Sequence, residues 1–344
     1  SGGIEDEQVR VRTMVALAVA SLAEAAAPYG IESFEPVLRP IWKGIRSHRG
    51  KALAAFLKAV GFLLGLMADE QAEFYGKELI PTLVREFASP DDEMKKIVLN
   101  VLRNIAEKCK KLPGELFLSI SDDFFAAFWS RRGSLDRRVS RAVLDATIAL
   151  TSRLGVSKIS GPLIEKLKDE AEALRKLALE ALEAIVIRFG AAEIDERSEE
   201  QLVDGLVTAV QEPGSEESAG SWLIRGWGVI ASALGGNRLR PYLPQLASLI
   251  LWRLGNRSAR IRQQSAELVA VLAPVFAAAG EETTLNKLAI VLYENLGEEY
   301  PDVLASIILG LKSIAGVIGL NKMTPPVACL LYTSPSPRDM VDYL

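Results

Sequence analysis

The sequence predicts an all-α fold, a HEAT-repeat α-solenoid in which antiparallel helix pairs stack into a superhelix. Apolar residues recur at the i, i+3, i+4, i+7 spacing of a helix face along most of the chain, and strand-like alternation is nearly absent. Six of the eight longest helical segments end at a glycine. The last five of these glycines lie about 35 to 45 residues apart, the period typical of HEAT repeats.

The first long helix is expected over 6–27. Asp6 and Glu7 place negative charge at the positive end of its dipole, apolar residues follow at helical spacing, and Pro28 and Gly30 stop it. The same plan predicts further long helices at 51–66, 92–110, 136–154, 172–189, 216–234, 259–278 and 301–318.

A partner helix is expected before each of these later helices, at 34–45, 73–87, 117–129, 159–167, 199–210, 241–253 and 283–295. Several carry an early proline, which a first helical turn tolerates. Because each pair has an apolar stripe, stacking should bury one continuous core. We therefore expect one array of about eight hairpins over 1–327, truncated at both ends.

The last residues, 328–344, break the pattern. The stretch ACLLYTSPSPRDMVDYL has no helical periodicity, and LYTSPSPRD resembles translated sequencing adapter. We expect this tail to be foreign to the fold.

Composition narrows the function classes. The net charge of −4 gives no global basic field for nucleic acid, so any such site must be a local cluster. Cys109 and Cys329 are no disulfide framework, which fits a reducing compartment, and no signal peptide is expected. The apolar run 303–320 contains Lys312 and two serines, so a buried helix is expected and no membrane partner.

Catalytic constellations are weak throughout. His48 is the single histidine and is expected in a loop. Gly226 and Gly228 superficially match a dinucleotide fingerprint but lack the preceding strand, which favours close helix packing. The trio Asp91, Asp92 and Glu93 is better explained as a helix cap than as a metal site. We therefore expect no enzyme, no cofactor and no metal.

Basic residues form the more informative pattern, because pairs of them open the second helices of successive hairpins. These residues are Arg10, Arg12, Arg49, Lys51, Lys95, Lys96, Arg137 and Arg138. In a solenoid, equivalent positions align into a ridge, which can follow a phosphate backbone. Arg175, Lys176, Arg257, Arg260 and Arg262 extend the pattern less regularly. The alternative is a solvated face paired with neighbouring acids.

Long ungapped blocks resemble the splicing factor 3b subunit 1 family. They include VRVRTMVALAVASLAEAAAPYGIESF, LRPIWKGIRSHRGKALAAFLKAVG, REFASPDDEMKKIVL, RLRPYLPQLASLILWRLGNRSARIRQQSAELV and VLYENLGEEYPDVLASIILGLKSIAGVIGLNKMTPP. The resemblance covers about 4–327 and thins over 109–160 and 215–227.

This resemblance implies a nuclear, non-catalytic HEAT scaffold and RNA clamp of the splicing factor 3b complex in the U2 snRNP. It holds the duplex of small nuclear RNA with the pre-mRNA intron branch site. The implied protein partners are a β-propeller subunit, a small zinc-bound subunit and an RRM protein. Arg10 stands where the family usually has lysine, and Arg49, Lys51 and Arg85 also match residues of its RNA-facing edge. The family's N-terminal partner-binding segment and later repeats are not matched, so this chain alone is not expected to recognise a branch adenosine.

A general HEAT-repeat protein–protein scaffold remains the alternative. Nuclear import receptors and phosphatase scaffolds also use helix ridges, but they usually bind basic or extended peptides through acidic or Asn-rich faces. RNA crosslinking mapped to residues would separate the two functions.

Overall fold

The computed structural model describes residues 2–130, 136–211 and 221–323. Helices account for 82% of these residues, and no strand occurs among them, which confirms the all-α prediction. The chain divides into two compact units, Ser1–Lys166 and Leu167–Leu344, and each is considered by itself. The expected tail at 328–344 lies outside the described residues.

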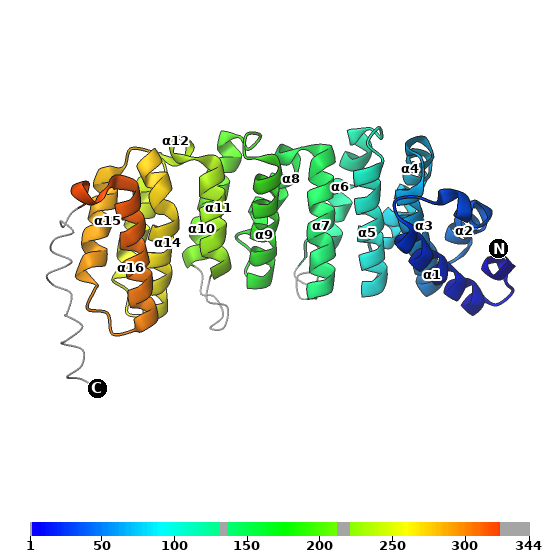
Figure 1. The fold of residues 1–344 in the computed structure, drawn as a ribbon, viewed down its shortest axis with the longest axis horizontal. Helices are drawn as coiled ribbons and strands as arrows, with labels where there is room; N and C mark the ends of the chain where they lie inside the picture. The colour runs from blue at the N-terminus through cyan, green and yellow to red at the C-terminus, as the bar shows by residue number, and fades with distance from the viewer. Residues whose placement is uncertain (1, 131–135, 212–220, 324–344) are drawn as a thin grey trace. The chain divides into compact units, whose positions relative to one another are not determined.

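Unit 1 consists of two layers of helices. Its elements are η1 (Gly2–Glu5), α1 (Val9–Ala26), η2 (Ile31–Phe34), α2 (Glu35–Ser47), α3 (Gly50–Leu66), α4 (Asp69–Glu86), α5 (Asp92–Lys108), α6 (Gly114–Phe128), α7 (Arg137–Leu154) and α8 (Val156–Lys166). One layer is formed by α1, α3, α5 and α7, each packed on the next, and α2, α4 and α6 pair with the helix that follows them (Figure 1).

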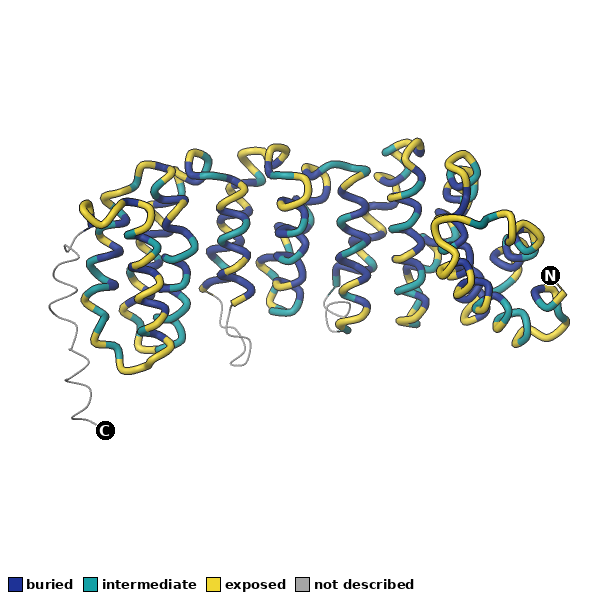
Figure 2. Tube along the Cα trace, viewed as in Figure 1, coloured by how far each residue is buried: buried dark blue, intermediate teal, exposed yellow. Residues whose placement is uncertain are grey.

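Buried and exposed positions recur along each helix of unit 1 (Figure 2), and the buried residues form a core between the two layers. The helix α3 contacts α1, α2 and α5, and its Leu53, Phe56 and Leu57 are fully buried. Gly44 allows α2 to approach α3 closely, because a Cβ there would lie 2.2 Å from the Phe56 ring. Burial on several sides explains why α3 is apolar around most of its circumference.

Unit 2 repeats this arrangement. Its elements are α9 (Glu172–Phe189), α10 (Glu196–Gln211), α11 (Ser221–Leu234), α12 (Gly236–Leu239), α13 (Leu243–Leu254), α14 (Ala259–Ala278), α15 (Glu282–Glu294), α16 (Pro301–Ile318) and η3 (Leu320–Lys322). One layer is α9, α11, α14 and α16, and α13 contacts α15 in the other. The predicted start of a helix at 216 lies outside the described residues.

Gly226 and Gly228 serve close helix packing, as predicted. A Cβ at Gly226 would lie 2.3 Å from Cδ2 of Leu179 in α9, and one at Gly228 would lie 3.3 Å from Cβ of Val271 in α14. The two glycines therefore let α11 fit between its neighbours in the layer.

The helix-ending glycines have positive φ, but most are not in the left-handed helical region that commonly follows a helix C-terminus. Gly30 has φ 98° and ψ 23°, which is left-handed. Gly155 and Gly190 combine φ of 86° and 79° with ψ of 161° and 179°. That region is open essentially to glycine alone, so the restriction to glycine is stronger than for an ordinary helix cap.

One expected helix is different in the structure. The segment 241–253 was expected to be a single helix, but it begins only at Leu243 and is preceded by the short α12. Pro241 stands in the turn between them, and Pro244 instead occupies the first turn of α13, where its missing N–H is tolerated.

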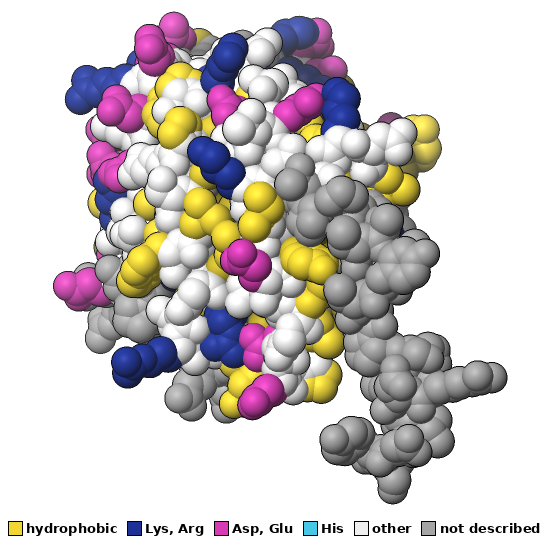
Figure 3. All heavy atoms as spheres, turned by 90° about the vertical axis from the view of Figure 1, so that its left-hand side faces the viewer, with side chains coloured by type: hydrophobic (Ala, Val, Ile, Leu, Met, Phe, Trp, Pro, Cys, Tyr) yellow, Lys and Arg dark blue, Asp and Glu magenta, His cyan; other side chains and the backbone are white. Residues whose placement is uncertain are grey.

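The helix α16 is the one described helix that is long and apolar enough to cross a membrane by length and composition. Its Val303, Ile307 and Ile314 are buried, and it packs on α14 and α15, as expected of a core helix. Ile308 and Leu309 are about half exposed. On the side of the molecule where α15 and α16 lie, hydrophobic side chains are interspersed with charged ones (Figure 3).

Candidate nucleic-acid interface

The first turns of α1, α3, α5 and α7 lie at one edge of unit 1. Arg12 near the start of α1 donates to Nε2 of His48 just before α3, with 3.1 Å between the nitrogens. Further along, Asn104 of α5 donates to the carbonyl of Gly61 in α3, and Arg103 of α5 approaches Asp145 of α7. Each of these contacts joins residues that lie at a similar distance along the chain from the starts of their helices, so the helices are parallel and in register.

We call the predicted basic residues at this edge the basic edge: Arg10, Arg12, Arg49, Lys51, Arg85, Lys95, Lys96, Arg137 and Arg138. All belong to the first two turns of these four helices or to the adjoining loops, except Arg85, which lies in the last turn of α4. Because α4 and α5 form a hairpin, the last turn of α4 lies at the same edge.

Three cations of the basic edge are the most available. The side chains of Arg10, Lys51 and Arg137 are exposed, and none of these side chains has a hydrogen bond or ion pair with another residue of the described ranges. Arg49 is exposed and donates to the carbonyl of its neighbour His48 at 2.7 Å. Arg138 is exposed and lies 3.8 Å from the Asp136 carboxylate. These five groups can rotate toward a ligand with little loss of existing contacts.

The cations near α5 are locally neutralised. Lys95 pairs with Asp92 at 3.1 Å, and Lys96 pairs with Glu93. Arg85 likewise contacts Glu86 at 3.0 Å. The α5 lysines are also half-buried rather than exposed, so they are weaker anion ligands than the cations of α1, α3 and α7.

Acidic residues cap two of these helices. The Asp91 carboxylate accepts from the N–H of Glu93, which confirms the cap interpretation of the trio at 91–93. The Asp136 carboxylate accepts from the N–H of Arg138, and this hydrogen bond lowers the pKa of Asp136. Asp136 therefore stays ionised at the start of α7 and offsets part of its local positive charge.

Arg12 has a different environment, because its guanidinium turns back into the loop before α1. It donates to the carbonyls of Asp6 and Glu7, while the Asp6 carboxylate accepts from the N–H of Gln8. The His48 ring that accepts from Arg12 also contacts the Gly44 carbonyl through Nδ1 and stacks on Phe56. His48 ends α2, as the loop prediction requires.

The same motif recurs twice in unit 2. Arg175 donates to the carbonyls of Asp169 and Glu170, and Arg262 to those of Asn256 and Arg257. In both, the Asp or Asn side chain accepts from the N–H two residues later. Arg175 is 3% exposed, and Arg262 also pairs with Glu298. The interpretation that Arg175 and Arg262 extend a phosphate-facing ridge is therefore wrong.

Sequence reasoning missed this motif, although a signal was present. Asp or Asn precedes arginine by six residues at 6–12, 169–175 and 256–262. The spacing brings the guanidinium over the loop that enters the helix, where its fork satisfies two carbonyls together.

The exposed cations are placed against the helix dipole. A positive charge in the first turn of a surface helix destabilises the helix by about 0.3–1 kcal/mol, because the helix dipole is positive at that end. Arg10, Lys51 and Arg137 all occupy such first turns. Folding alone does not favour them there, whereas an anion at this edge would meet both the cations and the N–H groups at the starts of α1 and α3, which have no side-chain cap.

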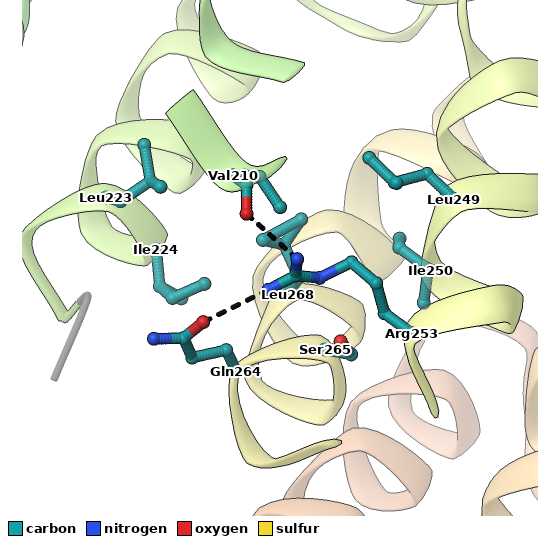
Figure 4. A pocket seen from close by; sticks show the side chains of 9 residues that line it. All are labelled: Val210, Leu223, Ile224, Leu249, Ile250, Arg253, Gln264, Ser265 and Leu268. Atoms are coloured by element: carbon teal, nitrogen blue, oxygen red, sulfur yellow. Dashed lines mark hydrogen bonds between the residues drawn. The ribbon is translucent and has the colours of Figure 1, made fainter. Parts of the chain in front are cut away.

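A small cavity in unit 2 holds no comparable site. Mainly apolar side chains of α10, α11, α13 and α14 surround the guanidinium of Arg253 (Figure 4). That group donates to the Val210 carbonyl and to Oε1 of Gln264, and burial lowers its pKa. The volume of about 10 Å³ has room for roughly one water molecule. Arg253 thus ties two hairpins together.

Among the described residues, no group of three or more His, Cys, Asp or Glu side chains lies close enough to hold a metal ion. The polar chemistry of the described ranges is instead hydrogen bonding and ion pairing between repeats, such as Arg238 with Glu199 in unit 2.

Two solved structures resemble the fold. An importin beta structure matches 99% of this chain and 44% of its own with a TM-score of 0.64 at 17% identity. A Kap121p structure, bound to the SUMO protease Ulp1p, matches 97% and 35% with a TM-score of 0.64 at 13% identity. At these identities the likeness supports the solenoid fold and carries no function.

Sequence relatives are much closer. The U2 snRNP component prp10 of Schizosaccharomyces pombe is 46% identical over 329 residues, which is 96% of this chain and 27% of prp10. The U2 snRNP component HSH155 of Saccharomyces cerevisiae is 43% identical over 328 residues, which is 95% of this chain and 33% of HSH155. No family model matches the chain. The chain spans about a third or less of these relatives' length, and it belongs to their family, splicing factor 3b subunit 1 of the U2 snRNP.

Proposed function

We propose that this chain is a non-catalytic scaffold and RNA clamp of the splicing factor 3b complex, acting in the nucleus in pre-mRNA splicing. Its RNA ligands would be the intron and the small nuclear RNA, and its protein partners the other subunits of that complex. The kinship with two U2 snRNP components supports the splicing role. The observation that supports RNA binding by the clamp is the row of exposed cations on parallel helix ends in unit 1.

The spacing of this row suits an RNA backbone. Neighbouring helices of one layer lie about 8–10 Å apart, so a cation from each could engage every second or third phosphate of a strand. Arg10, Lys51 and Arg137 stand on α1, α3 and α7, with Arg49 and Arg138 beside them. Such contacts read the backbone and its shape rather than base identity.

Arg12 is left out of this proposal because its guanidinium already holds the loop before α1. Lys95, Lys96 and Arg85 are secondary contacts, since an RNA phosphate would have to displace a carboxylate from each of them.

The test is a double charge reversal, Arg10→Glu with Lys51→Glu, measured by binding to a short A-form RNA duplex over a range of salt concentrations. We expect weaker binding to all duplex sequences and a salt slope smaller by roughly one unit per lost phosphate contact. Helicity should be unchanged, because both side chains are exposed and unpaired among the described residues.

The matched control is Lys77→Glu with Lys158→Glu, which makes the same change in net charge on exposed positions of α4 and α8. If both double variants bind RNA with the same affinity and salt slope, the basic edge is only a solvated face, and the clamp proposal is wrong.

A further inference from the structure

A second positively charged surface of unit 1 lies in the other helix layer, and it contains aromatic rings. Arg39, Trp42, Lys43 and Arg46 share one face of α2 at the spacing i, i+3, i+4, i+7. Together with Ser47 of α2 and Tyr75 of α4, these residues line an open cleft of about 370 Å³. Both α2 and α4 are labelled near the N-terminal part of the chain in Figure 1. The basic edge does not share these residues.

The aromatic corner of this cleft is preformed. The rings of Trp42 and Tyr75 meet edge to face with centroids 4.8 Å apart, and the Arg46 guanidinium lies 5.7 Å from the Trp42 ring centroid. Phe74, which is 63% exposed, stands edge-on to Tyr75. Apolar rings held in this geometry at the surface can receive a hydrophobic side chain with little reorganisation.

Positive charge in the cleft is incompletely balanced. Arg39 and Lys43 are exposed and have no ion pair with another residue of the described ranges. Arg46 approaches Glu78 at 3.5 Å, but both side chains are largely exposed, so this pair is weak and easily exchanged. Of these three cations, only Arg46 has an ion pair among the described residues, in a chain whose net charge is −4.

We propose that this cleft docks an extended acidic segment of a protein partner. Residues four apart on a helix are about 6 Å apart along its axis, and alternate side chains of an extended peptide are about 6.6 Å apart. A segment with acids at alternate positions thus places successive carboxylates against Arg39, Lys43 and Arg46 of α2, and its intervening apolar residues, which point the other way, toward Tyr75 of α4.

Single-stranded RNA fits this cleft less well. Base stacking needs an open ring face, but Arg46 covers one side of Trp42 and the Tyr75 ring is turned against it at 67°. Carboxylates need only the exposed N–H groups. This inference does not rest on the proposed RNA function, because it uses other residues and another ligand.

The probe is a fluorescein-labelled peptide, Gly-Glu-Leu-Glu-Phe-Glu-Gly, titrated with the 344-residue chain in a fluorescence anisotropy assay. We expect saturable binding that weakens at least about tenfold in the variant Arg39→Glu with Lys43→Glu. The control Lys77→Glu with Lys158→Glu should bind like the parent chain. Peptides with Gln for Glu, or Ser for Leu and Phe, should each bind more weakly.

The position of binding can be read from the Trp42 indole. In a chain labelled at tryptophan with nitrogen-15, the Trp42 signal, assigned from Trp42→Phe, should shift on peptide addition. Three results would each overturn the proposal: no saturable peptide binding below about 1 mM, equal binding by the cleft and control variants, or a cleft variant that loses affinity for decauridine RNA but not for the peptide.

Discussion

Gly226→Ala should destabilise unit 2, although alanine is the better helix former. The added Cβ would lie 2.3, 2.6 and 2.9 Å from Cδ2, Cγ and Cδ1 of Leu179, which is fully buried. Overpacking of this kind typically costs about 1–3 kcal/mol, and the helix propensity of alanine returns up to about 1 kcal/mol. Because the 2.3 Å contact is far inside van der Waals distance, we expect a cost of about 2–3 kcal/mol, and the net loss in unfolding free energy is then about 1–2 kcal/mol.

The matched control is Gly316→Ala in α16, which is the same substitution in the same unit. Gly316 is exposed, and a Cβ there meets nothing within 4 Å. This variant should be more stable by about 0.5–1 kcal/mol, because only the propensity gain acts. The two substitutions are thus expected to have opposite signs.

Thermal unfolding followed by circular dichroism measures both. A loss of 1–2 kcal/mol should lower the Tm by roughly 2–8 °C for a unit of this size. In the double variant Leu179→Ala with Gly226→Ala, the space left by leucine should accept the new methyl group, giving a favourable coupling of about 0.5–3 kcal/mol. A Gly226→Ala chain that melts at or above the parent Tm would refute the close packing of α11 on α9.

Three further predictions follow from single contacts. Arg175→Ala should lower the free energy of unfolding by about 1–3 kcal/mol, because it leaves two loop carbonyls without their donor. The control Lys176→Ala, at the exposed next position, should lower it by less than about 0.5 kcal/mol. Equal losses for the two variants in chemical denaturation would contradict the loop motif. The hydrogen bond from Arg262 lowers the pKa of Glu298 in the folded chain. The stabilisation from this pair should therefore be complete above the unfolded pKa of about 4.3 and should be lost as the pH falls through the lower folded value. Glu298→Gln should remove that part of the acid dependence of the Tm, and an unchanged pH profile of the Tm would contradict the pair. Burial raises the pKa of Cys109 to about 11, so iodoacetamide should modify the thiol slowly in the folded chain at neutral pH and readily in urea. Mass spectrometry of the peptide that contains Cys109 measures both rates, and equal rates would contradict its burial.

Much of the fold could be predicted because its signals are local. The expected bounds 172–189, 259–278 and 301–318 agree with α9, α14 and α16. Each of these segments combines an uninterrupted 3.6-residue period with a clear stop nearby. The region 236–254 was less predictable, since Pro241 and Pro244 are both acceptable near a helix start and only tertiary packing selects between them.

The candidate site was predictable in outline but not in detail. Periodic spacing correctly placed basic residues at the helix starts of one layer. It could not distinguish Arg10, which is exposed, from Arg12, whose partners are backbone carbonyls of the preceding loop. A sequence shows charge, whereas the direction of a flexible side chain depends on acceptors that only the folded loop brings together.

The second surface escaped sequence reasoning for a related reason. Arg39, Lys43 and Arg46 read as an ordinary polar face of α2, and Tyr75 belongs to the next hairpin. Only the packing of α2 beside α4 joins them into one cleft.

RNA is proposed to follow the parallel helix starts of α1, α3 and α7. Ultraviolet crosslinking of the chain to a short RNA duplex, mapped to individual residues by mass spectrometry, tests it most directly. We expect crosslinked peptides that contain the starts of these helices, around Arg10, Lys51 and Arg137, and loss of the first two in the variant Arg10→Glu with Lys51→Glu. Crosslinks confined to the layer of α2, α4 and α6, or unchanged by that variant, would contradict it.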